Sequence, residues 1–281
     1  MLPETFTFFE DSSLTLNASF YRSTTSSKDQ TIIYLHGGGL IWGDRKDLPL
    51  EYISQFLKAG YHFLAIDYPL APETALPEIY AAAAKAINWF SDQFISVLSL
   101  KTDDYFLFGR SAGAYLALLL AHDPALPKPK KILSFYGYHS VEESFYLSPS
   151  KHYQQYPTIP EKLKNQLVQS KPLVSGSLEN RYAIYIYCRQ TGKWLDVVMP
   201  QKRDRSQFSL LDTELKQLPP AFIAQSKQDQ DVPYALGVHL ANTIPYSKLF
   251  TVEKLTHDFD KDPTNPIAQQ AYTEAIDWLN N

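Results

Sequence analysis

YFLFGRSAGAYLALLLAH, residues 105–122, decides the fold of this chain. Its first four residues form an apolar, aromatic run that predicts a buried strand, and its Ala- and Leu-rich end predicts a helix. Between the two stands a G-x-S-x-G pattern at residues 109–113. This pattern is typical of a nucleophile elbow, in which a tight turn without bulky neighbours exposes a serine hydroxyl. We therefore expect Ser111 to act as a nucleophile; the alternative is an ordinary turn in which Ser111 caps the helix.

Short β-rich runs alternate with helical patterns along most of the chain. We expect strands at residues 31–36, 61–66, 105–108, 131–136, 221–224 and 248–252, and helices at 79–94, 112–122, 234–244 and 266–279. Two earlier runs, 5–10 and 14–22, flank a short polar turn and predict an antiparallel edge. Strands that alternate with helices imply a mostly parallel sheet with right-handed crossovers. The predicted fold class is therefore α/β, with a central sheet flanked by helices.

A polar, Tyr-rich region at residues 138–219 interrupts this alternation. We interpret it as a cap inserted into a core of residues 1–137 and 220–281, because ligands bind at the carboxyl ends of the strands in such sheets. Helices are expected at 159–168 and at 177–190. Ser177 is the expected N-cap of the second helix, and Gly192 is expected to end it. Residues 182–187 also have the composition of a strand, which is the alternative for this segment. The tyrosines either pack the cap or line a pocket: Tyr138, Tyr146, Tyr153, Tyr156, Tyr182, Tyr185 and Tyr187.

The run HGGGLIWG at residues 36–43 follows another predicted core strand. Glycines in this position are typical of the oxyanion-hole loop of esterases and lipases. Ester cleavage develops negative charge on the carbonyl oxygen, and backbone N–H groups with no side chain in the way can reach that oxygen. We expect the N–H groups of Gly38, Gly39 and Ala112 to be these donors. A phosphate-binding loop is the alternative, but the chain has neither a G-x-G-x-x-G nor a Gly-Lys-Ser/Thr pattern.

A serine nucleophile needs a base and an acid that orients the base, and in this type of sheet they follow in the order Ser, Asp or Glu, His. Asp229 and Asp231 both come after the strand predicted at 221–224. Asp229 lies closer to the end of that strand and is favoured as the orienting acid. His257, which follows the strand at 248–252, is favoured as the base, because His239 falls inside a helical pattern.

Composition and charge exclude several classes of protein. The chain has 281 residues with 44% hydrophobic content, which is enough for a large core. Its 26 Lys and Arg against 30 Asp and Glu give a net charge of -4, so no overall basic field would attract nucleic acid. No apolar run approaches the roughly 18 residues of a membrane span, and the first residues lack a signal-peptide pattern. We expect a cytoplasmic protein.

No cofactor or metal is expected. Cys188 is the only cysteine, which excludes an intramolecular disulfide and a multi-cysteine zinc site. Asp258, Asp260 and Asp262 alternate like the start of a calcium loop, but Pro263 stands where such a loop needs glycine. The expected partner is a small-molecule ester, and a homodimer is compatible with the sequence.

Three motifs resemble those of the α/β-hydrolase fold and, within it, of the carboxylesterases of the hormone-sensitive-lipase-like group. That group has an H-G-G-G-x-x-x-G loop, a D-Y-x-L-A-P-E segment and a G-x-S-A-G elbow, which match residues 36–43, 67–73 and 109–113. The similarity spans about residues 30–137 and 220–280. The resemblance implies Ser111 as nucleophile, His257 as base and Asp229 as orienting acid. It also implies an oxyanion hole made by Gly38, Gly39 and Ala112.

Four positions depart from the usual pattern of this group: Pro69 stands in place of Arg, Arg110 in place of Asp, Ala114 in place of Gly and Asp258 in place of Gly. None of them removes a member of the expected triad. The resemblance implies a serine carboxylesterase that hydrolyses small, short-chain esters through an acyl-enzyme. A peptidase or acyl-amidase would need the same triad, and a binding protein that keeps the scaffold without turnover is a further alternative. Arg110 is expected to meet a neighbouring carboxylate rather than the substrate.

Overall fold

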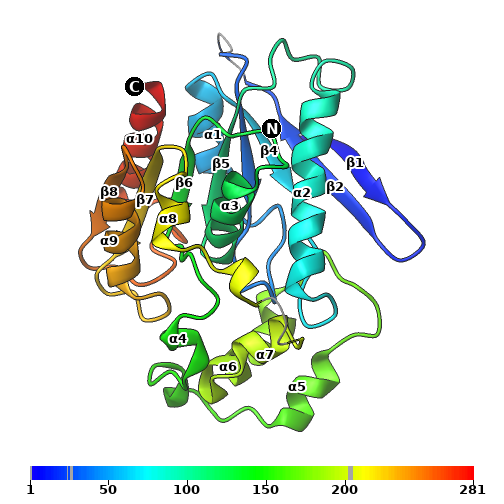
Figure 1. The fold of residues 1–281 in the computed structure, drawn as a ribbon, viewed down its shortest axis with the longest axis vertical. Coiled ribbons are helices and arrows are strands. Elements are labelled where there is room, and N and C mark those ends of the chain that lie inside the picture. Colours follow the sequence, from blue (N-terminus) through cyan, green and yellow to red (C-terminus); the bar gives the residue numbers. More distant parts are fainter. Residues whose placement is uncertain (1, 24, 26–27, 202–204) are drawn as a thin grey trace.

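An eight-stranded sheet forms the centre of the computed structural model, which describes residues 2–23, 25, 28–201 and 205–281. β2 runs antiparallel to β1 and to β4, and the other neighbouring pairs are parallel. The predicted α/β class and its antiparallel edge are both confirmed (Figure 1). In the order β1-β2-β4-β3-β5-β6-β7-β8, the strands are β1 (Glu4–Glu10), β2 (Thr15–Tyr21), β4 (His62–Ile66), β3 (Thr31–Leu35), β5 (Tyr105–Arg110), β6 (Ile132–Phe135), β7 (Ala221–Ser226) and β8 (Lys248–Val252).

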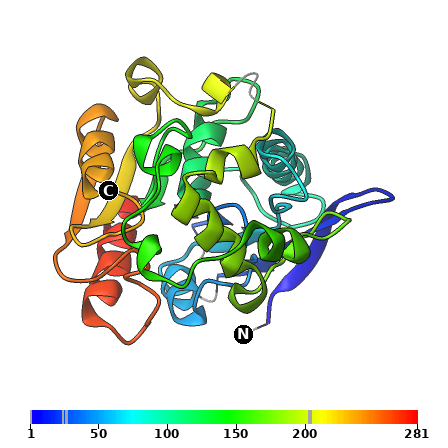
Figure 2. The same ribbon diagram turned by 90° about the horizontal axis from the view of Figure 1, so that it is seen from below.

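Helices cover both faces of this sheet (Figures 1 and 2). One face carries α2 (Leu76–Gln93), α3 (Ala112–His122), α8 (Asp212–Leu215) and α9 (Tyr234–Thr243), and the other carries α1 (Leu50–Lys58) and α10 (Pro266–Asn280). Successive residues of a buried strand point to opposite faces. In β3, Ile33 and Leu35 join the core beneath α2 and α3, whereas Ile32 and Tyr34 join the core beneath α1 and α10. Helix α1 is not among the elements that the sequence predicted.

The chain between β6 and β7 forms helices that lie at one end of the sheet (Figure 1). Residues 202–204 of this predicted insertion lie outside the described residues. The helix expected at 177–190 is confirmed at both ends: Ser177 Oγ accepts the N–H of Asn180, and Gly192 has the left-handed φ of 68° that ends many helices. The alternative strand at 182–187 is therefore wrong. The helices are α4 (Ser144–Leu147), α5 (Glu161–Leu167), α6 (Leu178–Thr191) and α7 (Trp194–Val198), with short 3-10 helices at Tyr153–Gln155 and Arg205–Phe208.

A buried arginine holds α6 against the core. Nη2 of Arg181 pairs with Oε2 of Glu73 at 2.6 Å, and both side chains are almost fully buried. Arg181 also donates to the carbonyl oxygens of Ile41 and Ala71, at 2.6 Å each. The segment 67–73, one of the three motifs, therefore anchors this helix through its last residue.

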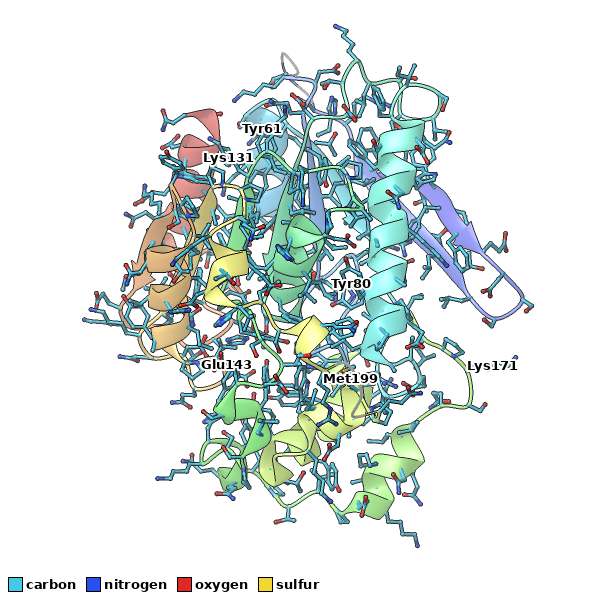
Figure 3. All side chains as sticks on the ribbon, viewed as in Figure 1. Tyr61, Tyr80, Lys131, Glu143, Lys171 and Met199 are labelled. Atoms are coloured by element: carbon cyan, nitrogen blue, oxygen red, sulfur yellow. The ribbon has the colours of Figure 1, made fainter. Side chains whose placement is uncertain are left out.

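Aromatic side chains make a second contact between the insertion and the core. Figure 3 shows Tyr80 on α2, above the helices of the insertion. Its ring packs edge-on against that of Phe208, with centroids 6.1 Å apart, and its hydroxyl donates to Asp123 just after α3. The insertion is thus attached to the core at more than one place. None of the helices in the described part of the chain is long and apolar enough to cross a membrane.

Glu73→Gln should destabilise the fold, because it leaves the charge of Arg181 buried without its partner. We expect the free energy of unfolding to fall by about 3–5 kcal/mol, as measured by urea denaturation followed through tryptophan fluorescence. Glu253→Gln is the matched control, because Glu253 pairs with Lys227 on the exposed surface, where ion pairs contribute little. The buried pair would have no special role if both variants unfolded at the wild-type midpoint.

Candidate active site

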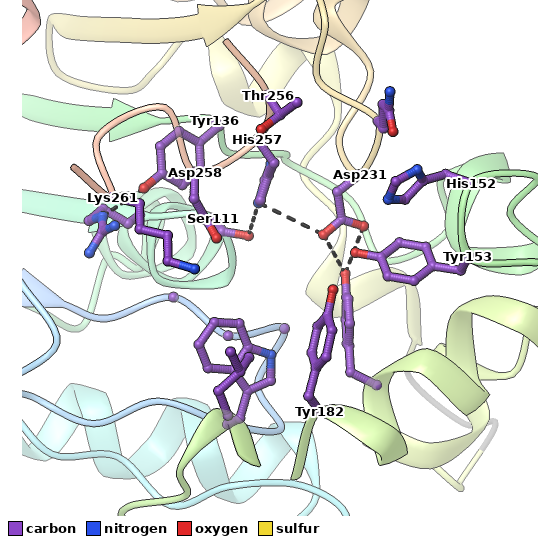
Figure 4. Close-up of a pocket in the computed structure, with 18 of the residues that line it drawn as sticks. Ser111, Tyr136, His152, Tyr153, Tyr182, Asp231, Thr256, His257, Asp258 and Lys261 are labelled. Atoms are coloured by element: carbon purple, nitrogen blue, oxygen red, sulfur yellow. Dashed lines mark hydrogen bonds and ion pairs between the residues drawn. The ribbon is translucent and has the colours of Figure 1, made fainter. Parts of the chain in front are cut away.

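Ser111 stands in a strained turn between β5 and α3. Its backbone has φ 52° and ψ -119°, a left-handed conformation that residues with a side chain rarely adopt. The turn is fixed because the N–H of Ser111 donates to the carbonyl of Phe135 on β6 at 2.9 Å. Gly113 is required beside it, since a Cβ there would lie 2.1 Å from the carbonyl oxygen of Leu35. The Ser111 hydroxyl therefore projects past the end of β5, toward His257 (Figure 4).

Three side chains that follow three strands form a chain of hydrogen bonds. Nε2 of His257 lies 2.9 Å from Oγ of Ser111, and Nδ1 lies 2.7 Å from Oδ2 of Asp229. Asp229 is fixed in turn, because Oδ1 accepts two backbone N–H groups at 2.8 Å and Oδ2 accepts the side-chain amide of Gln225 at 2.8 Å. The structure thus brings together the three residues that the sequence singled out. This arrangement is able to move a proton from the Ser111 hydroxyl to the imidazole.

The surroundings of His257 favour its protonated form. Burial by itself would lower the pKa of the imidazole, but the Asp229 carboxylate on Nδ1 outweighs that effect. Asp231 and Asp258 add further negative charge, so the pKa of His257 is raised above its ordinary value. Tyr136, at the end of β6, packs edge-on against the ring with centroids 4.7 Å apart. An imidazole held in this way is a strong acceptor for the Ser111 proton.

The glycine loop after β3 leaves backbone N–H groups free beside Ser111. Gly38 and Gly39 line the same pocket as Ser111, and Ala112 begins α3 directly after it. Within the described residues, the N–H groups of Gly38, Gly39 and Ala112 donate no hydrogen bond. Free N–H groups next to a nucleophile are able to stabilise negative charge on a carbonyl oxygen.

Side chains from the core and from the insertion hold this glycine loop. His36 stacks on Tyr68 with ring centroids 4.0 Å apart, and the Tyr68 hydroxyl donates to the carbonyl of His36 at 2.7 Å. Nε1 of Trp194 on α7 donates to the carbonyl of Gly39 at 2.9 Å. Gly39 has φ 60°, and a Cβ there would lie 2.4 Å from the ring of Tyr185 on α6. Glycine is therefore required at this position, and the insertion takes part in shaping the loop.

Ser111 opens into a pocket of about 630 Å³ that has an aromatic wall and a charged wall. The aromatic wall comes mostly from the insertion and consists of Trp42, His152, Tyr153, Tyr156, Tyr182 and Tyr185. The charged wall consists of Asp47, Arg110, Asp258 and Lys261.

The tyrosines of the insertion serve both purposes that the sequence left open. Four of them line the pocket, whereas three are buried in packing, namely Tyr138, Tyr146 and Tyr187. The sequence did not predict Trp42, Asp47, His152 and Lys261 as lining residues. No local pattern marks these residues, because it is the tertiary fold that brings them to the pocket.

Arg110, next to Ser111, belongs to a buried polar network. Nη2 pairs with Oδ1 of Asp260 at 3.1 Å, Nε donates to the Tyr136 hydroxyl at 2.6 Å, and Nη1 lies 3.5 Å from Asp47. The hydroxyl groups of Tyr136 and Tyr272 also donate to Asp260. Arg110 thus meets neighbouring carboxylates, as expected. Across the described ranges, no three His, Cys, Asp or Glu side chains are grouped to hold a metal ion.

The two alternatives that the sequence left for the base and its acid are placed differently. Asp231 lies near Nε2 of His257, at 3.9 Å, and not near Nδ1, which Asp229 occupies. His239 lies on α9 and hydrogen-bonds Asp212 at 2.9 Å. Asp229 and His257 therefore lie in the hydrogen-bond chain with Ser111, whereas Asp231 and His239 lie outside it.

Comparison with known proteins supports the same fold. A family model described as alpha/beta hydrolase fold matches residues 32–259, a range that includes the insertion. A protein of unknown function from Staphylococcus aureus subsp. aureus Mu50 is 31% identical with a TM-score of 0.88, over 99% of this chain and 98% of that one. An alpha/beta hydrolase superfamily protein from Enterococcus faecalis is 30% identical with a TM-score of 0.84, over 99% and 98%. An esterase from Pyrobaculum calidifontis is 19% identical with a TM-score of 0.67, over 98% and 83%, and shares the fold.

Curated relatives match only part of the chain. The non-reducing polyketide synthase mapC' from Penicillium brevicompactum is 30% identical over 161 residues. This match covers 52% of the present chain and 7% of the synthase, so the chain spans a small part of the length of that relative.

We expect the His257 imidazole to titrate above the ordinary value of about 6.5, because of the carboxylates around it. Asp229→Asn removes the nearest negative charge and should lower this pKa, since burial then opposes protonation with less compensation. A pH titration of the imidazole signals by NMR measures both values, and His239, which bonds Asp212 instead, is the control in the same spectra. An unchanged His257 pKa in Asp229→Asn would contradict this account of its electrostatics.

Proposed function

Because this chain belongs to the α/β-hydrolase fold family, we propose that it is a serine carboxylesterase with Ser111 as nucleophile, His257 as base and Asp229 as the acid that orients the base. The observation that carries the proposal is the hydrogen-bond chain through these side chains, with distances of 2.9 and 2.7 Å. Each residue follows a strand of the central sheet, β5, β8 and β7 respectively, so the sheet sets their spacing.

Acylation begins when Nε2 of His257 accepts the proton of Ser111 and Oγ attacks the ester carbonyl carbon. The carbonyl oxygen becomes negative, and the free N–H groups of Gly38, Gly39 and Ala112 are the donors that would stabilise it. The imidazolium then gives its proton to the leaving oxygen, so that the alcohol departs and the acyl group remains on Oγ. The hydrogen bond from Nδ1 to Asp229 keeps Nε2 directed at Oγ throughout.

Deacylation uses the same groups with water in place of the serine. Water attacks the acyl carbon while Nε2 of His257 takes one of its protons. The bond from carbon to Oγ breaks as that proton passes to Ser111, and the carboxylic acid leaves. His257 must be neutral at the start of each half-reaction, so its raised pKa makes the base less available as the pH falls.

The insertion and the pocket support a small substrate with a short acyl chain. In the proposed domain organisation, residues 1–137 and 220–281 form the catalytic core, and 138–219 form a cap over the pocket. Tyr182 and Tyr185 of α6 line that pocket together with Ser111. Among the described lining residues, Leu178 is the single aliphatic side chain. Each buried CH₂ group contributes about 0.8 kcal/mol against the aromatic wall, but a long acyl chain would also displace water from the charged wall, which supports a short chain.

Hydrolysis of p-nitrophenyl esters from acetate to palmitate tests the proposal. We expect the short-chain esters to be cleaved fastest, and Ser111→Ala to lose about 10⁶-fold in kcat because the nucleophile is absent. Circular dichroism of the variant is the control for folding. Ser111→Ala with wild-type activity would refute the mechanism, and a preference for palmitate would refute the short-chain assignment. Cleavage of an aminoacyl anilide without cleavage of any ester would point to an amidase instead.

A further inference from the structure

A second carboxylate faces the same nitrogen of His257 that bonds the proposed nucleophile. Oδ2 of Asp231 lies 3.9 Å from Nε2, and Oγ of Ser111 lies 2.9 Å from it. Figure 4 shows dashed lines that run from the same end of His257 to Ser111 and to Asp231, and both side chains line the pocket. The proposed triad has no role for Asp231, because Asp229 already occupies Nδ1.

Two residues of α6 fix the position of the Asp231 carboxylate. The Tyr185 hydroxyl donates to it, at 2.9 Å from Oδ1 and 2.8 Å from Oδ2. Nε of Arg189 lies 3.2 Å from Oδ1, and Nη2 donates to the backbone carbonyl of Asp231 at 3.1 Å. Asp231 is buried, with 8% of its surface exposed, and it lines the pocket. Its charge is thus compensated from the insertion, while Oδ2, which lies 3.9 Å from Nε2 of His257, keeps lone-pair capacity beyond the bond from Tyr185.

The gap between Asp231 and His257 is suited to one oxygen atom. At 3.9 Å, Oδ2 and Nε2 are too far apart for a direct hydrogen bond. An oxygen atom about 2.8 Å from each of them would bond both, because two such bonds span up to about 5.6 Å. During deacylation the attacking water must bond Nε2 with one hydrogen atom. Its second hydrogen atom is then able to reach Oδ2 of Asp231.

An alcohol at the same place cannot make both bonds. Its one hydroxyl hydrogen goes to Nε2 and one lone pair attacks the acyl carbon, so the group that faces the Asp231 carboxylate is either its alkyl group or its remaining lone pair, and neither donates a hydrogen bond. A buried acceptor that stays without its donor loses a charge-assisted hydrogen bond. The site therefore treats water and alcohols differently as acceptors of the acyl group.

We propose that Asp231 accepts a hydrogen bond from the second hydrogen atom of the hydrolytic water and thereby selects water over alcohols. This inference rests on the acyl-enzyme of the proposed function. Water forms the new bond to the acyl carbon, one proton passes through Nε2 of His257 to Oγ of Ser111, and the bond from carbon to Oγ breaks. Asp231 takes no proton, and the second hydrogen atom leaves with the carboxylic acid. Asp231 is then a catalytic residue of deacylation, because it touches the attacking water.

A purely structural role for Asp231 would be to tie α6 to the loop after β7. If Asp231 has only this structural role, a variant that weakens the contact should behave like a variant that removes the carboxylate. If Asp231 bonds the water, the two kinds of variant should differ. Tyr185→Phe removes one contact between α6 and the loop after β7 but keeps the carboxylate, which the pair with Arg189 still holds in place. Asp231→Asn and Asp231→Ala instead remove the charged acceptor. Asp258→Asn is the matched control, because it removes a carboxylate of the same pocket that does not contact Nε2 within the described residues.

The test is the ratio of methyl acetate to acetate formed from p-nitrophenyl acetate in buffer that contains methanol. This ratio compares the two acceptors on one acyl-enzyme, so it depends neither on the fraction of folded protein nor on the step that limits turnover. We expect Asp231→Ala to raise the ratio about 10-fold or more, because water alone loses a hydrogen bond. Asp231→Asn should raise it less, because the amide oxygen still accepts a hydrogen bond but no longer a charge-assisted one. Tyr185→Phe and Asp258→Asn should keep the wild-type ratio.

Two results would overturn the assignment of Asp231. One is a wild-type ratio in both Asp231 variants. The other is an equal rise of the ratio in Tyr185→Phe, which would show that the effect comes from the lost contact between α6 and the loop after β7. Failure of the proposed function looks different, because wild type would then release no p-nitrophenol, or Ser111→Ala would release it at the wild-type rate.

Discussion

The left-handed backbone of Ser111 is the constraint on which the rest of the site depends. A residue with a side chain at φ 52° costs on the order of 1–3 kcal/mol, and such a turn persists only where its surroundings fix it. Here β5 lies in the middle of the sheet, the N–H of Ser111 is bonded to β6, and Gly113 packs against the end of β3. Ser111 therefore has a fixed position relative to the ends of β3, β5 and β6, and His257 and the glycine loop meet it there.

Helix α6 connects the insertion to both sides of that position. Arg181, near the beginning of the helix, pairs with Glu73 of the loop after β4. Arg189, near the end of the helix, pairs with Asp231 of the loop after β7. Between the two, Tyr185 touches Gly39 and hydrogen-bonds Asp231. Buried charges are costly unless they are paired, so these contacts fix the helix in one register. The electrostatic setting of His257 is thus determined jointly by the core and the insertion.

The sequence predicted most of the core and the candidate site because both are encoded locally. The runs 36–43 and 109–113 each lie at the end of a strand, and distance from the strand end favours Asp229 over Asp231, in agreement with the contact of Asp229 with His257. Helix α1 was missed because it has only nine residues, although Tyr52, Ile53, Phe56 and Leu57 are buried along one side of it. The pairing of Arg110 with Asp260 and of Tyr185 with Asp231 joins residues 150 and 46 positions apart, and no local pattern encodes such contacts.

In the proposed mechanism, His257 activates Ser111 alone among the serine, threonine and tyrosine hydroxyl groups of the chain. Labelling with an alkyl fluorophosphonate, followed by mass spectrometry of the peptides, tests it most directly, because the reagent records which oxygen attacks and how fast. We predict a single adduct on Ser111, formed at least about 100-fold more slowly in His257→Ala, since a general base contributes about 10²–10⁴ to such a step. An adduct on another residue, or equal labelling of Ser111 in His257→Ala, would contradict the account.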